Sequence, residues 1–357
     1  MKFFKLITIM LLFPAVVFAG EWDYDFSAEV QGLYGYSDVK EHHHGIGKGK
    51  LKNTLTYSFD EETSAETHID FIGGLNRELQ NENQGRWGEE VYGIFDSSYG
   101  QIMAGQIENV ASLFHNGAPK TGAIQTGADV VDFMANPNWK RTSKETKFAT
   151  LTSTDINTDG VAAKVSYISP EIYGTALGFS YMPNAYNRKG LINKHAGYAH
   201  KDGFVGAIYS DQDWGFFESK ASFGYAQYQG NSKEFSYGLN LSRGNWSIGG
   251  GFRKSYIDGD NKSTPNRPLP TDFDGYREGY AWNVGVGYEI GPFSSALTYF
   301  EAKAENSENE SKIISFSNEY QVNKNLNIYA AAFYADYDNT TEDTKGYAVV
   351  AGIGVKF

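Results

Sequence analysis

The sequence has 357 residues, a formal net charge of −12 at pH 7 and no cysteine, and it contains 25 Tyr, 24 Phe and 40 Gly. The absence of cysteine excludes a disulfide framework, and the negative charge argues against nucleic acid as a partner. Many aromatic residues combined with many glycines predict strands that are joined by polar turns.

Residues 1–19 are predicted to be a signal peptide. Lys2 and Lys5 open an apolar run that ends at Ala19, a small residue of the kind found at cleavage sites. The run is short for a spanning helix, which needs roughly 20 residues, so a membrane anchor is less favoured. Cleavage there would leave one domain, residues 20–357, and loss of the two lysines takes the charge from −12 to −14.

Period-two alternation begins at the start of this domain, over residues 22–37. Every second residue from Trp22 to Tyr36 is apolar or glycine, and the positions between them are mostly polar. Such alternation places the two sets on opposite faces of one strand. Tyr24 and Tyr34 are separated by roughly 33 Å of strand. When tilted, this length matches the apolar band, about 25 Å tall, between the two aromatic girdles of an outer-membrane barrel.

The same alternation recurs along the chain and predicts about 16 strands in an all-β, transmembrane antiparallel barrel. The expected strands are 22–37, 48–59, 63–73, 88–95, 100–107, 160–168, 174–182, 203–210, 216–228, 233–243, 245–256, 279–290, 293–303, 310–320, 326–337 and 346–357. Short turns alternate with longer connections, the outer-membrane pattern. A soluble sandwich or propeller is less favoured, because it does not account for aromatic residues at both ends of the apolar faces.

The connection over residues 108–159 is far longer than any other. Connections of this length in a compact fold are usually functional or disordered. Its apolar patches, 110–114 and 130–134, would be poorly placed on an exposed rim. We therefore expect residues 108–138 to fold into the lumen and narrow it. Residues 147–151 have some strand character, and we expect them to remain in or near this loop or to extend the following strand.

Three stretches resemble the general diffusion porins of Gram-negative bacteria: residues 90–106, 165–181 and 347–357. The resemblance implies a homotrimeric barrel in the outer membrane, in contact with lipid and lipopolysaccharide, whose third long loop folds inward. It also implies that the last strand, with its terminal Phe357, is an assembly signal for the outer-membrane assembly machinery. The acidic stretch of the family's inward loop is matched only loosely here, by residues 127–133.

Charged residues on the polar faces of the predicted strands are the strongest functional candidates. Lys48, Lys50 and Lys52 occupy alternate positions of one strand. Lysine facing lipid at mid-bilayer would cost about 2–4 kcal/mol, so these lysines are expected to face the lumen. Opposed charges across a narrow gap would order dipolar solutes and set an ion preference. The candidate pore constriction comprises Lys48, Lys50, Lys52, Lys164, Arg253, Glu108, Asp129 and Asp132.

Two further clusters give no catalytic or metal site. Glu66, His68 and Asp70 alternate on one strand, but chemistry there would need groups converging from other strands. The tract His42–His44 is more consistent with an exposed, mobile loop than with a metal site. We therefore expect no cofactor, no metal and no enzymatic activity.

The sequence thus predicts an outer-membrane porin for the passive diffusion of ions and small hydrophilic solutes. The mature charge predicts a modest cation preference. One alternative is a substrate-selective channel of similar architecture, which rows of aromatic residues in the lumen would indicate. A second alternative is an adhesin or enzyme barrel, and such barrels are often smaller with filled interiors.

Overall fold

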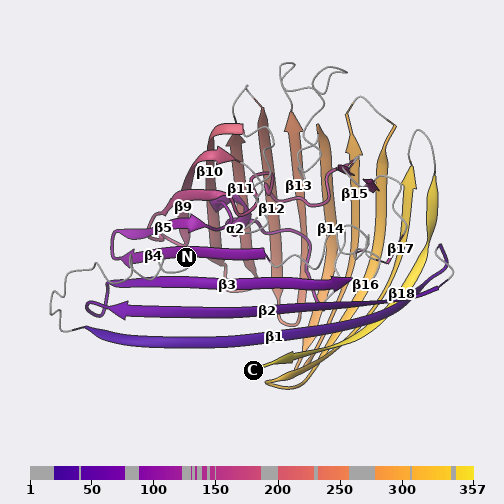
Figure 1. The fold of residues 1–357 in the computed structure, drawn as a ribbon, viewed down its shortest axis with the longest axis horizontal. Coiled ribbons are helices and arrows are strands. Elements are labelled where there is room, and N and C mark those ends of the chain that lie inside the picture. Colours follow the sequence, from indigo (N-terminus) through magenta and orange to yellow (C-terminus); the bar gives the residue numbers. More distant parts are fainter. Residues whose placement is uncertain are drawn as a thin grey trace, which may run out of the picture.

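The computed structural model describes residues 20–39, 42–76, 88–122, 130, 133–134, 139–142, 145–148, 150–185, 200–228, 232–256, 278–305, 308–338 and 343–357. Its main feature is a closed barrel of sixteen antiparallel strands (Figure 1). Strands that are consecutive around the barrel are also consecutive in the chain, except that β5 pairs with β8 across the long connection and β18 pairs with β1. The predicted fold class and strand number are confirmed.

The barrel strands follow the alternating segments of the sequence closely. They are β1 (Glu21–Ser37), β2 (His42–Ser58), β3 (Ser64–Asn76), β4 (Gly88–Ser97), β5 (Gly100–Gln106), β8 (Ala163–Ile168), β9 (Thr175–Ala185), β10 (His200–Asp213), β11 (Glu218–Gln227), β12 (Lys233–Arg243), β13 (Trp246–Tyr256), β14 (Gly279–Ile290), β15 (Phe293–Ala304), β16 (Glu310–Asn323), β17 (Leu326–Asp338) and β18 (Thr344–Lys356).

The ends of the chain close the barrel, because β18 pairs with β1. At the last residue, the Phe357 amide donates to the Ala28 carbonyl at 2.8 Å, and the Ala28 amide donates back at 3.2 Å. This pairing removes the free edges that an open sheet would present between its first and last strands.

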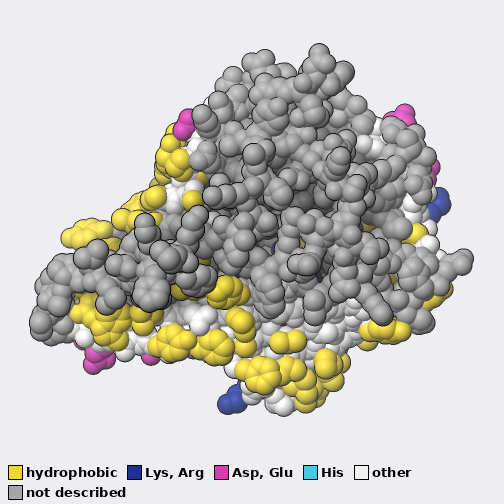
Figure 2. Space-filling model, viewed as in Figure 1, with side chains coloured by type: hydrophobic (Ala, Val, Ile, Leu, Met, Phe, Trp, Pro, Cys, Tyr) yellow, Lys and Arg dark blue, Asp and Glu magenta, His cyan; other side chains and the backbone are white. Residues whose placement is uncertain are grey.

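Large hydrophobic side chains are exposed at alternate positions of most barrel strands. On β17, Ile328 and Tyr334 are exposed, whereas Ala331 and Ala335 are buried. We call the side of the strands with exposed hydrophobic residues the apolar face. The opposite side carries most of the polar and charged residues, together with small residues such as alanine, and we call it the polar face. Figure 2 shows hydrophobic side chains along the lower edge of the molecule, where Figure 1 has β1 and the ends of β16–β18.

The long connection between β5 and β8 contains short elements of its own. A one-turn helix, α2 (Val110–Phe114), lies near its start and contacts β9, β10 and β11. A hairpin of β6 (Trp139–Thr142) and β7 (Glu145–Phe148) forms a separate two-stranded sheet, so residues 147 and 148 do not add a strand to the barrel. Among the described residues, no helix has the length and apolar character needed to cross a membrane.

The prediction that His42–His44 belong to an exposed loop is wrong. These residues open β2, where His42 lies opposite Ser37 and His44 lies opposite Gly35. The reason is that the alternation of β1 continues as far as Ser37 and offers backbone partners to these residues. The connection between β1 and β2 is correspondingly shorter than predicted.

Candidate functional site

The long connection covers residues 107–162, and we call its described first part, residues 107–122, the outgoing arm. This arm runs along the polar face and donates backbone hydrogen bonds to side chains on four strands of the wall. The bonds are Val110 N to Ser180 Oγ on β9 (3.1 Å), Asn116 N to Ser222 Oγ on β11 (3.0 Å), Ala118 N to Asn283 Oδ1 on β14 (3.1 Å) and Gly122 N to Glu319 Oε2 on β16 (3.2 Å).

Glycines on the polar face permit this close approach. A Cβ atom at Gly238 would overlap the carbonyl oxygen of Asn116, and one at Gly249 would lie 2.7 Å from the carbonyl oxygen of Gly117. In contrast, Gly206 shares the apolar face of β10 with Phe204 and Ile208, and a Cβ there would meet nothing within 4 Å among the described residues. The sequence therefore provides backbone without side chains where the outgoing arm lies against the wall.

The middle of the connection is described at Val130, Phe133 and Met134. All three residues are buried in a hydrophobic cluster that also contains Leu33 on β1 and Val350 on β18. Packing against these wall residues removes the three side chains from water, which favours this placement.

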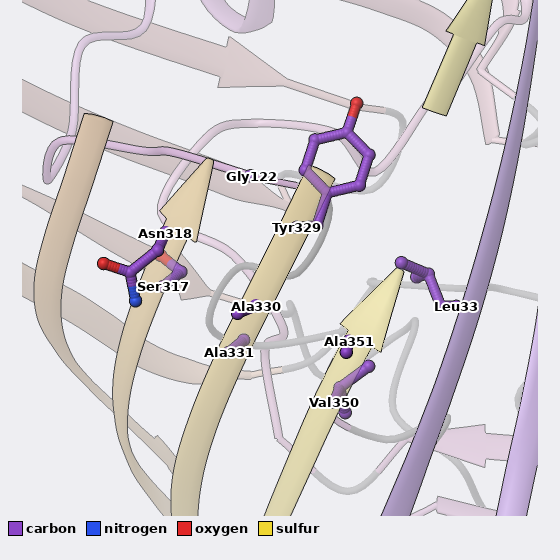
Figure 3. A pocket seen from close by; sticks show the side chains of 9 residues that line it. All are labelled: Leu33, Gly122, Ser317, Asn318, Tyr329, Ala330, Ala331, Val350 and Ala351. Carbon is purple, nitrogen blue, oxygen red and sulfur yellow. The ribbon is translucent and has the colours of Figure 1, made fainter. Parts of the chain in front are cut away.

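A small cavity marks the border between the outgoing arm and the wall. Figure 3 shows Leu33 and Tyr329, from neighbouring parts of the wall, beside Gly122 of the arm. The cavity has room for about one water molecule. It is therefore a packing defect at this border, too small for a solute.

Residues 150–162 lead back to β8, and we call them the return arm. The Thr150 and Ser311 hydroxyls lie 2.9 Å apart, which joins this arm to β16. Thr154 lies 2.8 Å from His115 Nε2 in the outgoing arm and accepts a hydrogen bond from Asn283 Nδ2 at 3.2 Å. The two arms thus lie against each other and against the same part of the wall.

Lys164, a predicted pore residue, is fully buried where the return arm joins β8. Its ammonium group lies 2.8 Å from Asp159 Oδ2, and both side chains are 0% exposed. The ammonium donates to the carbonyl oxygens of Gly160 and Ile107. Both charged groups of this ion pair are therefore shielded from solvent.

Arg253, another predicted pore residue, is also fully buried. Its Nη2 atom lies 2.7 Å from Glu234 Oε2, and both side chains are 0% exposed. The guanidinium also donates to Asn157 Oδ1 and Thr158 Oγ1, each at 2.8 Å. A charge that is out of contact with water and saturated with hydrogen bonds is a packing element of the wall.

The three lysines of β2 share the polar face with acidic residues. In the strand register Lys50 lies opposite Glu29, Lys52 lies opposite Asp70, and Asp70 lies opposite Glu90. Lys50 Nζ is 3.8 Å from Asp70 Oδ2, with side-chain exposures of 33% and 5%. Lys48 lies opposite Gln31. The wall is therefore of mixed charge, which the lysine pattern alone did not indicate.

His68 on β3 contacts side chains of both neighbouring strands, β2 and β4. Its Nε2 lies 2.8 Å from Glu66 Oε2, its Nδ1 lies 3.2 Å from Thr54 Oγ1, and its ring stacks on Tyr92 with centroids 4.5 Å apart. Both ring nitrogens thus have protein partners. Within the described part of the chain, no three His, Cys, Asp or Glu residues are grouped so that they would hold a metal ion.

The acids of the two arms are Glu108, Asp155 and the buried Asp159. The Ser112 hydroxyl lies 3.2 Å from Glu108 and 3.1 Å from Asp155, so it donates to one of them at a time. Partial desolvation, together with the charges of Asp155 and Glu90, raises the pKa of Glu108. Burial opposes ionisation of Asp155, but nearby Arg253 and His115 bring its pKa below the usual value.

Asp129 and Asp132, the remaining predicted acids, lie outside the described residues. Asp155 and Glu90 carry no signal in the sequence that marks them as site residues. Asp155 stands in a segment without periodicity, and Glu90 is a single acid in a strand-forming segment. Their relevance emerges from the strand register and from the course of the return arm.

A closed barrel with an apolar face towards its surroundings and a charged polar face defines an outer-membrane channel. A family model described as Gram-negative porin matches residues 13–341, and the chain belongs to this family. The resemblance inferred from the sequence is confirmed, and so are the outer-membrane location and the channel function. The family and the fold point to a channel rather than an enzyme.

Solved structures share this fold at low sequence identity. The anion-selective porin from Comamonas acidovorans is 12% identical, with 94% of this chain and 100% of that chain covered and a TM-score of 0.61. The trimer form of the Vibrio cholerae outer membrane protein OmpT is 11% identical (94% and 99% covered, TM-score 0.60). Salmonella typhi OmpF in complex with daunomycin is 12% identical (94% and 97%, TM-score 0.62). No curated protein sequence matches the chain.

Proposed function

We propose that this porin is a passive diffusion channel for ions and small hydrophilic solutes, and that its long connection lies inside the lumen and narrows it. The observation that carries the proposal is the contact of both arms with the polar face of the wall. In an outer-membrane barrel the apolar face meets lipid, and the polar face surrounds the lumen. A segment that packs on the polar face then takes up part of the bore.

The mixed charges of the wall support a weak ion preference. Lys48, Lys50 and Lys52 of β2 face the lumen in this proposal, and acids of the neighbouring strands partly cancel their charge. Glu108 and Asp155 add negative charge on the connection, and we keep Asp129 and Asp132 as further acids of the constriction. The full sequence has a charge of −12, and loss of Lys2 and Lys5 with the signal peptide makes the mature charge −14. This negative charge concentrates cations at the mouth of the channel. The expected result is a modest preference for cations.

The remaining proposals concern assembly. We propose that export removes residues 1–19, that the barrel forms a homotrimer in contact with lipid and lipopolysaccharide, and that it carries out no turnover chemistry. The existence of a trimer form of OmpT, a protein with the same fold, supports the homotrimer. The last strand, β18, and Phe357 directly after it close the barrel against β1, and this supports their role as a signal for the assembly machinery.

The test is a recording of single channels in planar bilayers, combined with liposome swelling in sugars of increasing size. Deletion of residues 123–129 should raise the conductance and admit larger sugars, because it shortens the connection that we propose narrows the bore. A deletion of equal length at residues 261–267, between β13 and β14, is the matched control and should change neither. If the first deletion leaves conductance and size cutoff unchanged, the long connection does not form the constriction.

A further inference from the structure

We infer that Lys164 and Arg253 are positioning residues, which hold the return arm against the wall and so fix the size of the bore. Together with Asp159 and Glu234 they form two buried ion pairs, which we call the clamp. The inference rests on the proposed location of the connection in the lumen. It gives these two basic residues a role other than the lining of the pore.

The first ion pair of the clamp ties both ends of the connection to β8. Lys164 on β8 pairs with Asp159 at the end of the return arm and donates to the carbonyl of Ile107 at the start of the outgoing arm. Asp159 Oδ1 accepts hydrogen bonds from Asn109 Nδ2 at 2.6 Å and from the Tyr228 hydroxyl at 3.2 Å. A single buried carboxylate thus joins the two arms and the wall.

The second ion pair belongs to the wall itself. Glu234 on β12 and Arg253 on the neighbouring strand β13 are joined by a charge-assisted hydrogen bond from Nε at 2.8 Å. Two consecutive residues of the return arm bind to this pair: Asn157 accepts from the guanidinium, and Thr158 contacts both charged groups. The arm is therefore held by neutral side chains that fit between paired charges.

The energetics favour a positioning role over a simple gain of stability. A buried ion pair is often no more stabilising than an apolar pair of similar volume, whereas removal of one partner leaves an uncompensated charge. Fixed hydrogen-bond directions, in contrast, allow only one placement of the arm. After loss of either basic residue, the remaining carboxylate reaches water only if the arm moves away from the wall.

Burial separates this role from that of a pore charge. The side chains of Lys164 and Arg253 are 0% exposed, whereas that of Lys50 is 33% exposed. Removal of a buried charge should therefore alter the position of the arm. Removal of the exposed charge should alter the field that permeating ions experience. Lys50→Met is thus a matched control for Lys164→Met.

The experiment records single channels of the full-length mature protein in planar bilayers, for Lys164→Met, Arg253→Met and Lys50→Met. The two buried-site variants should show higher conductance and greater open-channel noise, with little shift of the reversal potential in a salt gradient. Lys50→Met should shift the reversal potential in a salt gradient without the rise in conductance and open-channel noise. Wild-type protein that forms no channel would contradict the proposed function, whereas conducting variants with wild-type noise and conductance would overturn the clamp alone.

A cross-link provides a rescue that a general loss of packing would not permit. The chain has no cysteine, so a disulfide introduced by Thr150→Cys and Ser311→Cys would be unique. These hydroxyls are 2.9 Å apart. Oxidation should return the Arg253→Met channel to wild-type conductance, and a reducing agent should reverse this. A cross-linked variant that remains noisy and wide would show that displacement of the arm is not the cause, and would overturn the inference.

Should a buried-site variant fail to fold, Thr158→Val provides the same test with both ion pairs intact. It removes only the hydroxyl that joins the arm to Arg253 and Glu234. We expect increased noise with a smaller change of conductance than in Arg253→Met. Thr158→Val channels indistinguishable from wild type would contradict the clamp, because this contact is central to it.

Discussion

The Arg253 guanidinium lies 2.7 Å from the Glu234 carboxylate, and neither side chain is exposed to solvent. Each group has further partners in the return arm, so the pair connects two strands of the wall with the connection that crosses the polar face. Charged groups are retained in such a place only when their hydrogen bonds are satisfied. The stability of the barrel should therefore depend on both members together.

A double-mutant cycle should reveal this dependence. Arg253→Met alone leaves the Glu234 carboxylate buried without its partner, and we expect a loss of about 3–5 kcal/mol in the free energy of unfolding. Glu234→Leu combined with Arg253→Met removes both charges and should restore much of the loss. Urea unfolding of the barrel in detergent micelles measures these values. If the loss in the double variant equals the sum of the losses in Arg253→Met and Glu234→Leu alone, the two residues are not coupled.

Replacement of basic or acidic wall residues that are at least partly exposed should move ion selectivity in opposite directions. Lys50→Gln with Lys52→Gln should increase the preference for cations, whereas Glu90→Gln with Glu66→Gln should shift it towards anions. Reversal potentials in a salt gradient provide the measurement. Both shifts should fade at high salt, because the Debye length falls from about 10 Å at 0.1 M to about 3 Å at 1 M. Shifts of equal sign would contradict the mixed-charge wall.

The barrel could be predicted from the sequence because its information is periodic. Alternation on β1 from Trp22 to Tyr36 fixes which side chains share a face, and other barrel strands, such as β17, carry the same pattern. Strand number, pairing and the polar face of the lysines all follow from it. The start of β2 could not be predicted, because the residues His42–His44 have no alternation and take their strand structure from the partner strand.

The site was predicted less completely, because parity identifies the face of a residue but not what covers it. Lys50 and Lys164 both occupy polar-face positions, yet one is partly exposed and the other lies beneath the connection. The connection has no periodicity, and α2 is only five residues long. Its course over the wall depends on contacts with glycines and serines that are far away in the sequence, and no local pattern encodes these contacts.

The assembly should be visible on a denaturing gel. We expect the mature protein to migrate as a trimer in SDS without heating and as an unfolded monomer after boiling, because a closed barrel leaves no strand edge from which to unfold. Circular dichroism of the unheated sample should be dominated by strand. Cross-linking in native membranes is the second measurement. An unheated sample at the position of the unfolded monomer would contradict the prediction.

Acid should loosen the connection through His115 in the outgoing arm. Its Nδ1 atom is buried and has no hydrogen-bond partner among the described atoms. Burial lowers the pKa of His115 from 6.5 to about 4, with Asp155 opposing this shift and Lys120 and Arg253 adding to it. Between pH 6.5 and 4, His115 is protonated in the unfolded chain but neutral in the folded chain. The free energy of unfolding should therefore fall as the pH drops from 6.5 towards 4.

The measurement is the temperature at which the barrel converts to the unfolded form, recorded across this pH range. His115→Gln keeps a side chain that can bind Thr154 but does not titrate, and it should flatten the pH dependence. Open-channel noise should rise over the same interval in the wild type only. An identical pH profile for the two proteins would assign the acid sensitivity to other groups.

A single methyl group should be enough to displace the outgoing arm. A Cβ atom at Gly238 would overlap the carbonyl oxygen of Asn116, which is backbone and can yield only if the arm moves. We therefore expect Gly238→Ala to raise conductance and to admit larger sugars. Gly206→Ala is the matched control, because a Cβ there meets nothing within 4 Å among the described residues. The two substitutions carry the same backbone effect, since both replace a strand glycine by alanine. Equal conductance and equal sugar cutoffs for the two variants would mean that the arm does not limit the bore.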